Sequence, residues 1–244
     1  MPVSVHQEPQ RWAEEHFTGA KLTDIRRVAR VKESAEAMAV HLGRRIPKLC
    51  RSPYAVQAPY TLFKHEEATP ENLQSGHRAV VREAMRQPGV SLLLADTTER
   101  SWSGKQPIAG LGPIGKSAAG LQGFFVHTVL SVGWPDAPQD SSKRQPGEVI
   151  GLGEQQYYVR TPCRQPRESS QERLKRARES QVWTHASHRV GCAPEGVRWV
   201  RGADRDADID AYWVSCQELG HGFVIRAAKD RALRHPETGK GAGR

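Results

Sequence analysis

Two aspartates more than a hundred residues apart are the side chains of this sequence best placed to bind a divalent metal. Asp96 ends the apolar run "VSLLLAD" and Asp204 ends "GVRWVRGAD", and both runs are typical of buried strands. We expect the second strand to lie beside the first, with the two carboxylates together at one edge of a sheet. Adjacent carboxylates repel unless a cation lies between them, and oxygen ligands favour Mg²⁺ or Mn²⁺. The pair therefore predicts a metal site that acts on a phosphodiester.

Two other interpretations of these acids compete with a metal site. An aspartate at a strand end often only caps a turn or faces solvent. The alternation of Asp204, Asp206 and Asp208 also imitates a calcium-binding loop. That loop requires glycine where Ile209 stands and glutamate where Ser215 stands, so it is excluded. We expect Asp206 and Asp208 in the first turn of the next helix, where the helix dipole favours negative charge.

The stretch "GLGPIGKS" at 110–117 fits the phosphate-binding pattern G-x-x-x-x-G-K-[ST]. Such a loop binds phosphate only between a buried strand and the N-terminus of a helix. The following residues, "AAGLQGFFVHTVL", contain two more glycines and continue into a strand. The sequence therefore predicts a glycine-rich connection here and no nucleotide site.

From residue 89 onward the sequence predicts an α/β domain with the order β-β-β-α-β-α-β. Three successive strands with short links favour antiparallel pairing, and the two later strands, each reached through a helix, favour parallel crossovers. A capping box, Ser169-x-x-Glu172, opens the first helix. The expected strands lie at 90–96, 123–132, 148–160, 196–204 and 221–230, and the helices at 168–180 and 207–220.

The first ninety or so residues are predicted to be helical. Residues 23–43 place apolar side chains three or four apart, with Thr23 as the expected N-cap. A second helix is expected from Thr69 and Pro70 to a stop signal at 87–89. Between them lie three aromatic side chains that we expect to pack together, namely Tyr54, Tyr60 and Phe63.

The chain carries a net charge of +9 at pH 7, which is typical of proteins that bind nucleic acids. Between Lys21 and Arg51 there are nine Lys/Arg against three Asp/Glu, so this helical window alone carries +6. Such a helix face supplies phosphate contacts and a salt-sensitive affinity. The alternative is a solvated face of a merely basic protein. The expected DNA-binding residues are Arg26, Arg27, Arg30, Arg44, Arg45 and Lys48.

Cysteine spacing and hydropathy exclude several other classes of protein. Cys50, Cys163, Cys192 and Cys216 include no C-x-x-C pair, which argues against a zinc knuckle and a disulfide framework. No apolar run approaches the ~18–20 residues of a membrane span. The N-terminus lacks the apolar core of a secretion signal. We therefore expect isolated thiols in a cytoplasmic protein that has no membrane partner.

Several stretches, taken in order, carry a resemblance to a known family. The N-terminal matches are Trp12, Phe17, Leu22, Asp24, Arg26, Arg27, Ala29 and Arg30. The later ones are "DTT" at Asp96–Thr98, "VHTVL" at Val126–Leu130, "ES" with Trp183 just after, and "ADRDADIDAY" at Ala203–Tyr212. From about Trp12 to Asp230, the chain resembles the DDE transposases of the insertion-sequence-four family.

This resemblance implies a helical DNA-binding domain at 1–88, an incomplete ribonuclease-H-like core at 89–233 and, at 234–244, a tail that we expect to be disordered because it has no apolar content. It implies that Asp96 and Asp204 are the first two catalytic acids, which coordinate Mg²⁺ during the strand cleavage and strand transfer of cut-and-paste transposition. The partner is then double-stranded DNA at transposon ends, in the bacterial cytoplasm at the nucleoid.

The resemblance also marks a difference. Family members carry a third acid, a glutamate, on a helix well beyond the fifth strand, within a Tyr/Arg/Glu/Lys signature. Neither Glu218, before the fifth strand, nor Glu237, in the tail, matches that place. We therefore expect a C-terminally truncated transposase with crippled catalysis. Two alternatives stay open: a non-catalytic DNA-binding regulator, as a homodimer or in a heterodimer with full-length transposase, and a decayed remnant without function.

Overall fold

The computed structural model describes residues 8–50, 52–104, 106–115, 121–134, 147–160, 179–231, 233–234, 238 and 241–243. The chain forms two compact units. The first comprises residues 1–91 and 130–154, and the second comprises residues 92–129 and 155–244. The domain boundary that we expect near residue 88 stays a prediction. No helix within the described ranges is long and apolar enough to cross a membrane.

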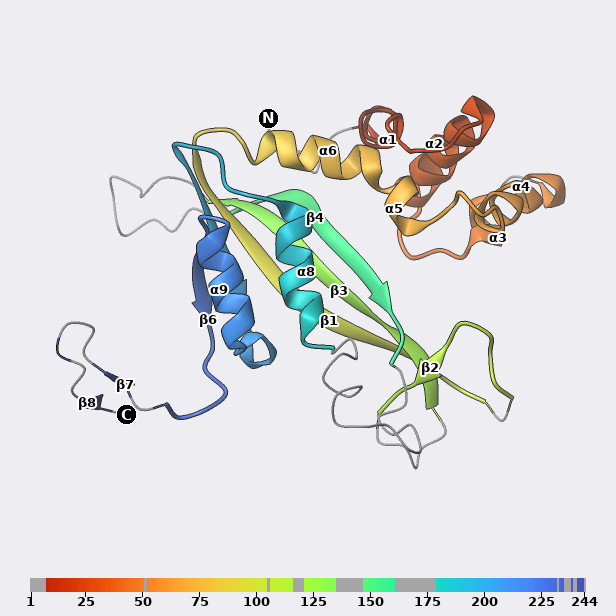
Figure 1. The fold of residues 1–244 in the computed structure, drawn as a ribbon. Coiled ribbons are helices and arrows are strands. Elements are labelled where there is room, and N and C mark those ends of the chain that lie inside the picture. Colours follow the sequence, from red (N-terminus) through yellow and green to blue (C-terminus); the bar gives the residue numbers. More distant parts are fainter. Residues whose placement is uncertain are drawn as a thin grey trace. The chain divides into compact units, whose positions relative to one another are not determined.

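The N-terminal region is helical, as predicted (Figure 1). Its helices are α1 (Pro9–Phe17), α2 (Ile25–Val40), α3 (Ile46–Leu49), α4 (Pro53–Phe63), α5 (Pro70–Leu73) and α6 (Ser75–Ala84).

The start of α2 differs from the prediction by one residue. Asp24 is the N-cap, because its Oδ1 accepts the backbone N–H of Arg26 at 2.9 Å. Thr23, the predicted cap, instead donates its hydroxyl to Oε1 of Glu67 at 2.7 Å. The hydroxyl of Thr23 therefore binds the carboxylate of Glu67, 44 residues away, and does not cap the helix as its position in the sequence predicts.

The second predicted helix is two helices. Thr69 caps α5 as expected, since its Oγ1 accepts the backbone N–H of Asn72 at 3.2 Å. The helical path is interrupted at Gln74, which separates α5 from α6. Gln74 serves both as the C-cap of α5 and as the N-cap of α6.

A helix occupies the stretch in which we expect a cluster of aromatic side chains. Ser52 caps α4 by accepting a backbone N–H of its first turn, and Pro53 takes the first helical position. Tyr60 and Phe63 are 45% and 42% exposed, and no contact between their rings is found among the described residues. Helical geometry explains this, because α4 turns both side chains outward. The side chain of Tyr54 lies outside the described residues.

A close approach of α1 and α6 depends on glycine. A Cβ atom on Gly76 would lie 2.6 Å from the carbonyl oxygen of His16 and 3.0 Å from Cα of Gly19. The approach brings Nδ1 of His16 within 3.0 Å of Nδ1 of His77, whose Nε2 accepts the backbone N–H of Leu152 at 3.0 Å. Burial, with the nearby charges of other side chains, lowers the pKa of His77 to about 4, so the ring is neutral at pH 7.

One sheet contains the strands β1 (Gly89–Ser103), β2 (Gly112–Pro113), β3 (Leu121–Trp134), β4 (Glu148–Tyr158), β5 (Val197–Ala203) and β6 (Gly222–Ile225). Its order is β2-β3-β1-β5-β6, and β4 also pairs with β3. β5 lies beside β1, as predicted. β5 and β6 run parallel in the register Val200↔Gly222 to Ala203↔Ile225, which confirms the crossover through a helix. The mixed sheet and the helices confirm an α/β protein.

β2 lies within the glycine-rich stretch at 110–117. Gly112 and Pro113 pair antiparallel with Gly123 and Gln122 of β3. This short strand belongs to a strand-to-strand connection, as predicted. The residues 116–120 that follow it lie outside the described part of the chain.

Two helices, α8 (Gln181–Val190) and α9 (Asp210–Glu218), lie on the same face of the sheet (Figure 1). The ring of Trp183 in α8 lies 4.6 Å from His127 of β3 and 5.5 Å from Tyr212 of α9, measured between centroids. The capped helix predicted at 168–180 falls on residues outside the described part, apart from its last two residues, which form a turn.

The C-terminal residues are described only in part. β7 (Leu233–Arg234) pairs antiparallel with β8 (Gly241–Gly243). The predicted disorder of 234–244 stays a prediction, and Glu237 lies outside the described residues. The described cysteines, Cys50, Cys192 and Cys216, are free thiols. Cys163 also lies outside the described residues.

Candidate functional site

In the first unit, α2 and α4 line a groove with a volume of about 400 Å³. Three arginines from the first two turns of α2 face it, namely Arg26, Arg27 and Arg30. The opposite wall comes from α4 and the residues just after it: Gln57, Ala58, Thr61, Leu62 and His65. The structure thus brings together three of the six residues predicted to bind DNA.

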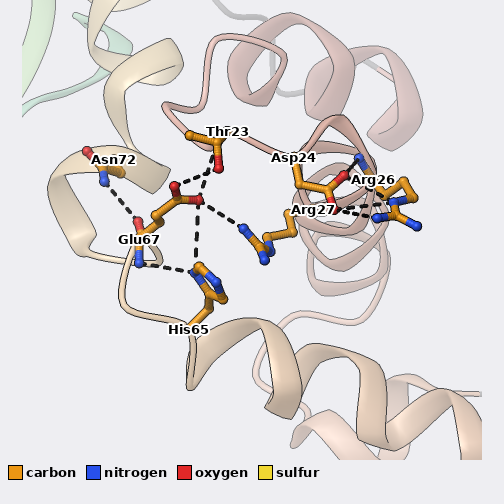
Figure 2. Close-up of polar contacts among 7 residues, drawn as sticks. All are labelled: Thr23, Asp24, Arg26, Arg27, His65, Glu67 and Asn72. Atoms are coloured by element: carbon orange, nitrogen blue, oxygen red, sulfur yellow. Dashed lines mark hydrogen bonds and ion pairs between the residues drawn. The ribbon is translucent and has the colours of Figure 1, made fainter.

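Glu67 holds the two walls of this groove together (Figure 2). Its Oε2 accepts a hydrogen bond from Nη1 of Arg27 at 3.1 Å and from the backbone N–H of Thr23 at 3.2 Å. Its own N–H donates to Nδ1 of His65 at 3.2 Å, and Nδ2 of Asn72 donates to its carbonyl oxygen at 2.9 Å. The hydrogen bonds from Thr23 lower the pKa of the Glu67 carboxyl, and the positive charge of Arg27 adds to this.

Arg26 and Arg30 form exposed ion pairs within their own helix region. Nη2 of Arg26 lies 2.9 Å from Oδ2 of Asp24, and Nη1 of Arg30 lies 2.7 Å from Oε2 of Glu33. The side chain of Arg26 is 89% exposed, whereas that of Arg27 is 33% exposed. Exposed ion pairs contribute little to stability, so both outer guanidinium groups can exchange a carboxylate for a phosphate. Arg27 is the most firmly held of the three.

The other three predicted residues do not line this groove. Arg44 follows the end of α2, Arg45 is the N-cap of α3, and Lys48 lies within α3. All three are exposed, and none has a side-chain partner among the described residues. They follow α2 in the sequence and add positive charge to this region, but they do not line the groove.

In the second unit, Asp96 and Asp204 lie on neighbouring strands and project to the same face. A Cβ atom on Gly202 of β5 would lie 2.7 Å from Cδ2 of Leu94 in β1, so these two positions share a face. Asp96 lies two residues after Leu94, and Asp204 lies two residues after Gly202. Because side chains in a strand alternate with a period of two, each aspartate projects to the same face as the residue two positions before it. Asp204 keeps an extended backbone, with φ −84° and ψ −163°, so the alternation continues past β5.

The position of Asp96 within its strand differs from the prediction. β1 continues to Ser103, so Asp96 lies inside the strand and not at its end. Apart from Trp102, the residues that extend β1 are polar and largely exposed, and they therefore carry little hydrophobic signal. Pairing with neighbouring strands, rather than burial, keeps this part of the chain extended.

Residues 9–68 match the model of a family described as Transposase DNA-binding. The protein is transposase-related. The match runs from α1 to just past α4 and includes the groove, its three arginines and Glu67. The groove therefore lies inside a transposase DNA-binding domain, and this helical region has a DNA-binding role.

The α4 wall of the groove is a part of this transposase-related domain that sequence reasoning misses. Pro59, in the middle of the segment, is typical of a helix break. Ser52 followed by Pro53 is nevertheless a helix-start signal that could have revealed α4. The helix places Gln57 and Thr61 one turn apart at the groove.

Asp96 and Asp204 differ in their side-chain contacts. Oδ1 of Asp204 accepts the backbone N–H of Asp206 at 2.9 Å and caps the 3-10 turn η2 (Arg205–Ala207). The carboxylate of Asp96 is exposed and has no hydrogen-bond partner among the described residues. Mg²⁺ usually binds one or two carboxylates and keeps several waters. The described residues contain no group of three or more His, Cys, Asp and Glu side chains placed to bind a metal.

Asp208 has a different place from the one predicted, because α9 begins only at Asp210. The side chain of Asp208 is 1% exposed, accepts the backbone N–H of Ala228 at 2.7 Å, and lies 2.6 Å from Nη1 of Arg231. The guanidinium of Arg231 in turn lies 4.7 Å from the ring centroid of Trp213. These contacts tie the chain after β6 to the turn that carries Asp204.

Proposed function

We propose that this transposase-related protein binds the double-stranded DNA of transposon ends in the groove between α2 and α4. One observation carries the proposal: Arg26, Arg27 and Arg30 line a single groove inside the segment that matches the transposase DNA-binding family. Duplex DNA carries a negative charge about every 1.7 Å along its axis. A chain with a net charge of +9 and three arginines in one groove attracts it strongly.

Base recognition falls to α4 in this proposal. Gln57 and Thr61 present an amide and a hydroxyl group at the groove. Such groups form hydrogen bonds with base edges, whereas arginines bind phosphates and set the register. The 16 residues of α2 span about 24 Å, and Arg44, Arg45 and Lys48 extend the positive charge beyond its end.

The carboxylate pair has a second part in the same process. Asp96 and Asp204 hold Mg²⁺ or Mn²⁺ at the DNA backbone, and the ion supplies charge stabilisation and an activated water. The sheet order, with β5 beside β1, supports a ribonuclease-H-like core. The chemistry that such an ion would serve is the strand cleavage and strand transfer of cut-and-paste transposition.

DNA binding without cleavage is the second candidate function. The groove lies in the first unit and the carboxylates lie in the second, so duplex binding does not need the acids. Such a protein regulates transposition by occupying transposon ends at the bacterial nucleoid. It does so as a homodimer or in a heterodimer with a cleavage-competent transposase.

A salt titration with labelled duplex DNA tests the groove. Each phosphate contact contributes about 0.9 to the slope of log K against log salt, so Arg26→Gln with Arg30→Gln should reduce the slope by about 2. Arg198→Gln, which removes an exposed arginine outside the groove, should leave the slope unchanged. An unaltered slope in the double variant would show that DNA binds elsewhere.

A plasmid that carries the transposon ends separates the two candidate functions. Metal-dependent cleavage that disappears in Asp96→Asn and in Asp204→Asn supports the enzyme. Duplex binding without cleavage in the wild-type protein supports the regulator. Cleavage that survives both substitutions refutes the assignment of the acids.

A further inference from the structure

A row of aromatic side chains crosses three strands of the second unit. The ring centroid of Phe124 in β3 lies 5.6 Å from that of Trp102 in β1 and 6.0 Å from that of Tyr157 in β4. Trp102 and Tyr157 are 45% and 44% exposed. Phe124 is three residues before His127, which faces Trp183 of α8, so the row lies on the opposite face of the sheet.

Side-chain hydrogen bonds hold one end of this row in place. The hydroxyl of Tyr157 donates to Oε1 of Gln155 at 2.6 Å, and Nε2 of Gln155 donates to Oγ1 of Thr128 at 3.2 Å. The ring of Tyr157 is thus oriented before any ligand arrives. Preorganisation of this kind lowers the entropy lost on binding.

A free cation lies beside the rings. Arg100 precedes Trp102 by two residues, so it shares the face of the aromatic row. Its side chain is exposed and has no partner among the described residues. The same face of β1 continues to Asp96, six residues from Trp102, or about 20 Å at ~3.3 Å per residue.

We propose that Trp102, Phe124 and Tyr157, together with Arg100, form a platform on which unpaired DNA bases stack. Every base has a π-face, and exposed rings on adjacent strands of a sheet are a general means of binding single-stranded nucleic acid. Arg100 supplies the contact to a phosphate. The platform depends on the proposed function in one respect only, which is that the protein binds DNA. It uses other residues than the α2–α4 groove, and it lies in the other unit.

Labelled oligothymidine, titrated into the full-length protein, tests the platform. Trp102→Ala and Tyr157→Ala should each weaken binding by about five- to one-hundred-fold. Trp102→Phe and Tyr157→Phe keep a ring and should bind nearly as the wild type does. Trp134→Ala removes a tryptophan of similar exposure, 49%, at the end of β3, and should have no effect. An abasic oligonucleotide of the same length should bind weakly to the wild type and to Trp102→Ala alike.

Four results would overturn the platform. Oligothymidine binding that is unchanged in Trp102→Ala would do so, as would equal affinity for the abasic strand. A change in sedimentation without a change in DNA affinity would assign the row to contact with a second copy of the chain. The groove is tested separately from the platform. In the double variant Arg26→Gln with Arg30→Gln, the affinity for duplex DNA should fall and the affinity for oligothymidine should persist. If both fall together in that variant, unpaired DNA binds the groove and the platform is wrong.

Discussion

Nη1 of Arg27 and Oε2 of Glu67 lie 3.1 Å apart across 40 residues of chain. Through this contact Glu67 holds the start of α2, while its backbone N–H binds His65 at the end of α4. The groove therefore owes its shape to a residue that does not line it. Arg27 has a structural part in the groove in addition to its charge.

Glu67→Gln should lower the melting temperature and weaken duplex binding, because α2 and His65 lose a common charged partner. The pKa of Glu67 is lowered in the fold, so its stabilisation is present above the ordinary pKa of a glutamate and is lost as the pH falls through the lowered value. In thermal melts at several pH values, the melting temperatures of the wild type and the variant should become equal at acid pH. Glu66→Gln, at an exposed neighbour, is the control, and identical melts for the two variants would contradict the role of Glu67.

Gly76→Ala should destabilise the first unit by about 1–3 kcal/mol, because the new Cβ atom meets backbone on two sides. Urea unfolding measures this loss. Gly104→Ala is the matched control, since its Cβ atom would have Nε2 of Gln122 as its nearest neighbour, at 3.7 Å. Equal urea midpoints for the two variants would mean that α1 and α6 can move apart without a loss of stability.

The folded protein should lose stability between about pH 6.5 and pH 4. Burial lowers the pKa of His77 and of His127 to about 4, so the unfolded chain takes up their protons first. At about 1.4 kcal/mol per pKa unit, each ring alone costs roughly 2–4 kcal/mol over this range. Urea midpoints should fall less steeply in His127→Gln than in the wild type. His188→Gln, at an exposed histidine, should keep the wild-type slope, and parallel slopes for all three proteins would refute the assignment.

Asp208→Asn should expose the chain after β6 to protease. The substitution removes the charge that holds Arg231 and weakens the acceptor for the N–H of Ala228. Trypsin should then cleave after Lys229 and Arg231 several-fold faster than in the wild type, as followed by mass spectrometry. Asp210→Asn is the control, because its Oδ1 lies 3.9 Å from Nη2 of Arg231 and its side chain is 86% exposed. Equal cleavage rates in the two variants would show that Asp208 does not hold this segment.

Features with a local cause can be predicted from the sequence alone. The cap at Thr69, the parallel pairing of β5 with β6 and, for its described residues 110–115, the strand-to-strand connection are all confirmed. The errors occur where distant residues compete with local ones. Thr23 binds Glu67 instead of capping α2, and Asp208 binds Arg231 instead of lying in the first turn of α9.

The sequence alone was enough to indicate a basic helical region, an α/β order of elements and two aspartates on neighbouring strands. Charge and hydrophobic periodicity depend on residues that are close together in the sequence, so they can be read without the tertiary structure. Packing alone determined which side chains share a surface. Gln57 and Thr61 meet the arginines of α2 only because α4 forms the opposite wall. The aromatic row likewise joins residues from three strands, and the order of those strands depends on tertiary pairing, which no single stretch of sequence contains.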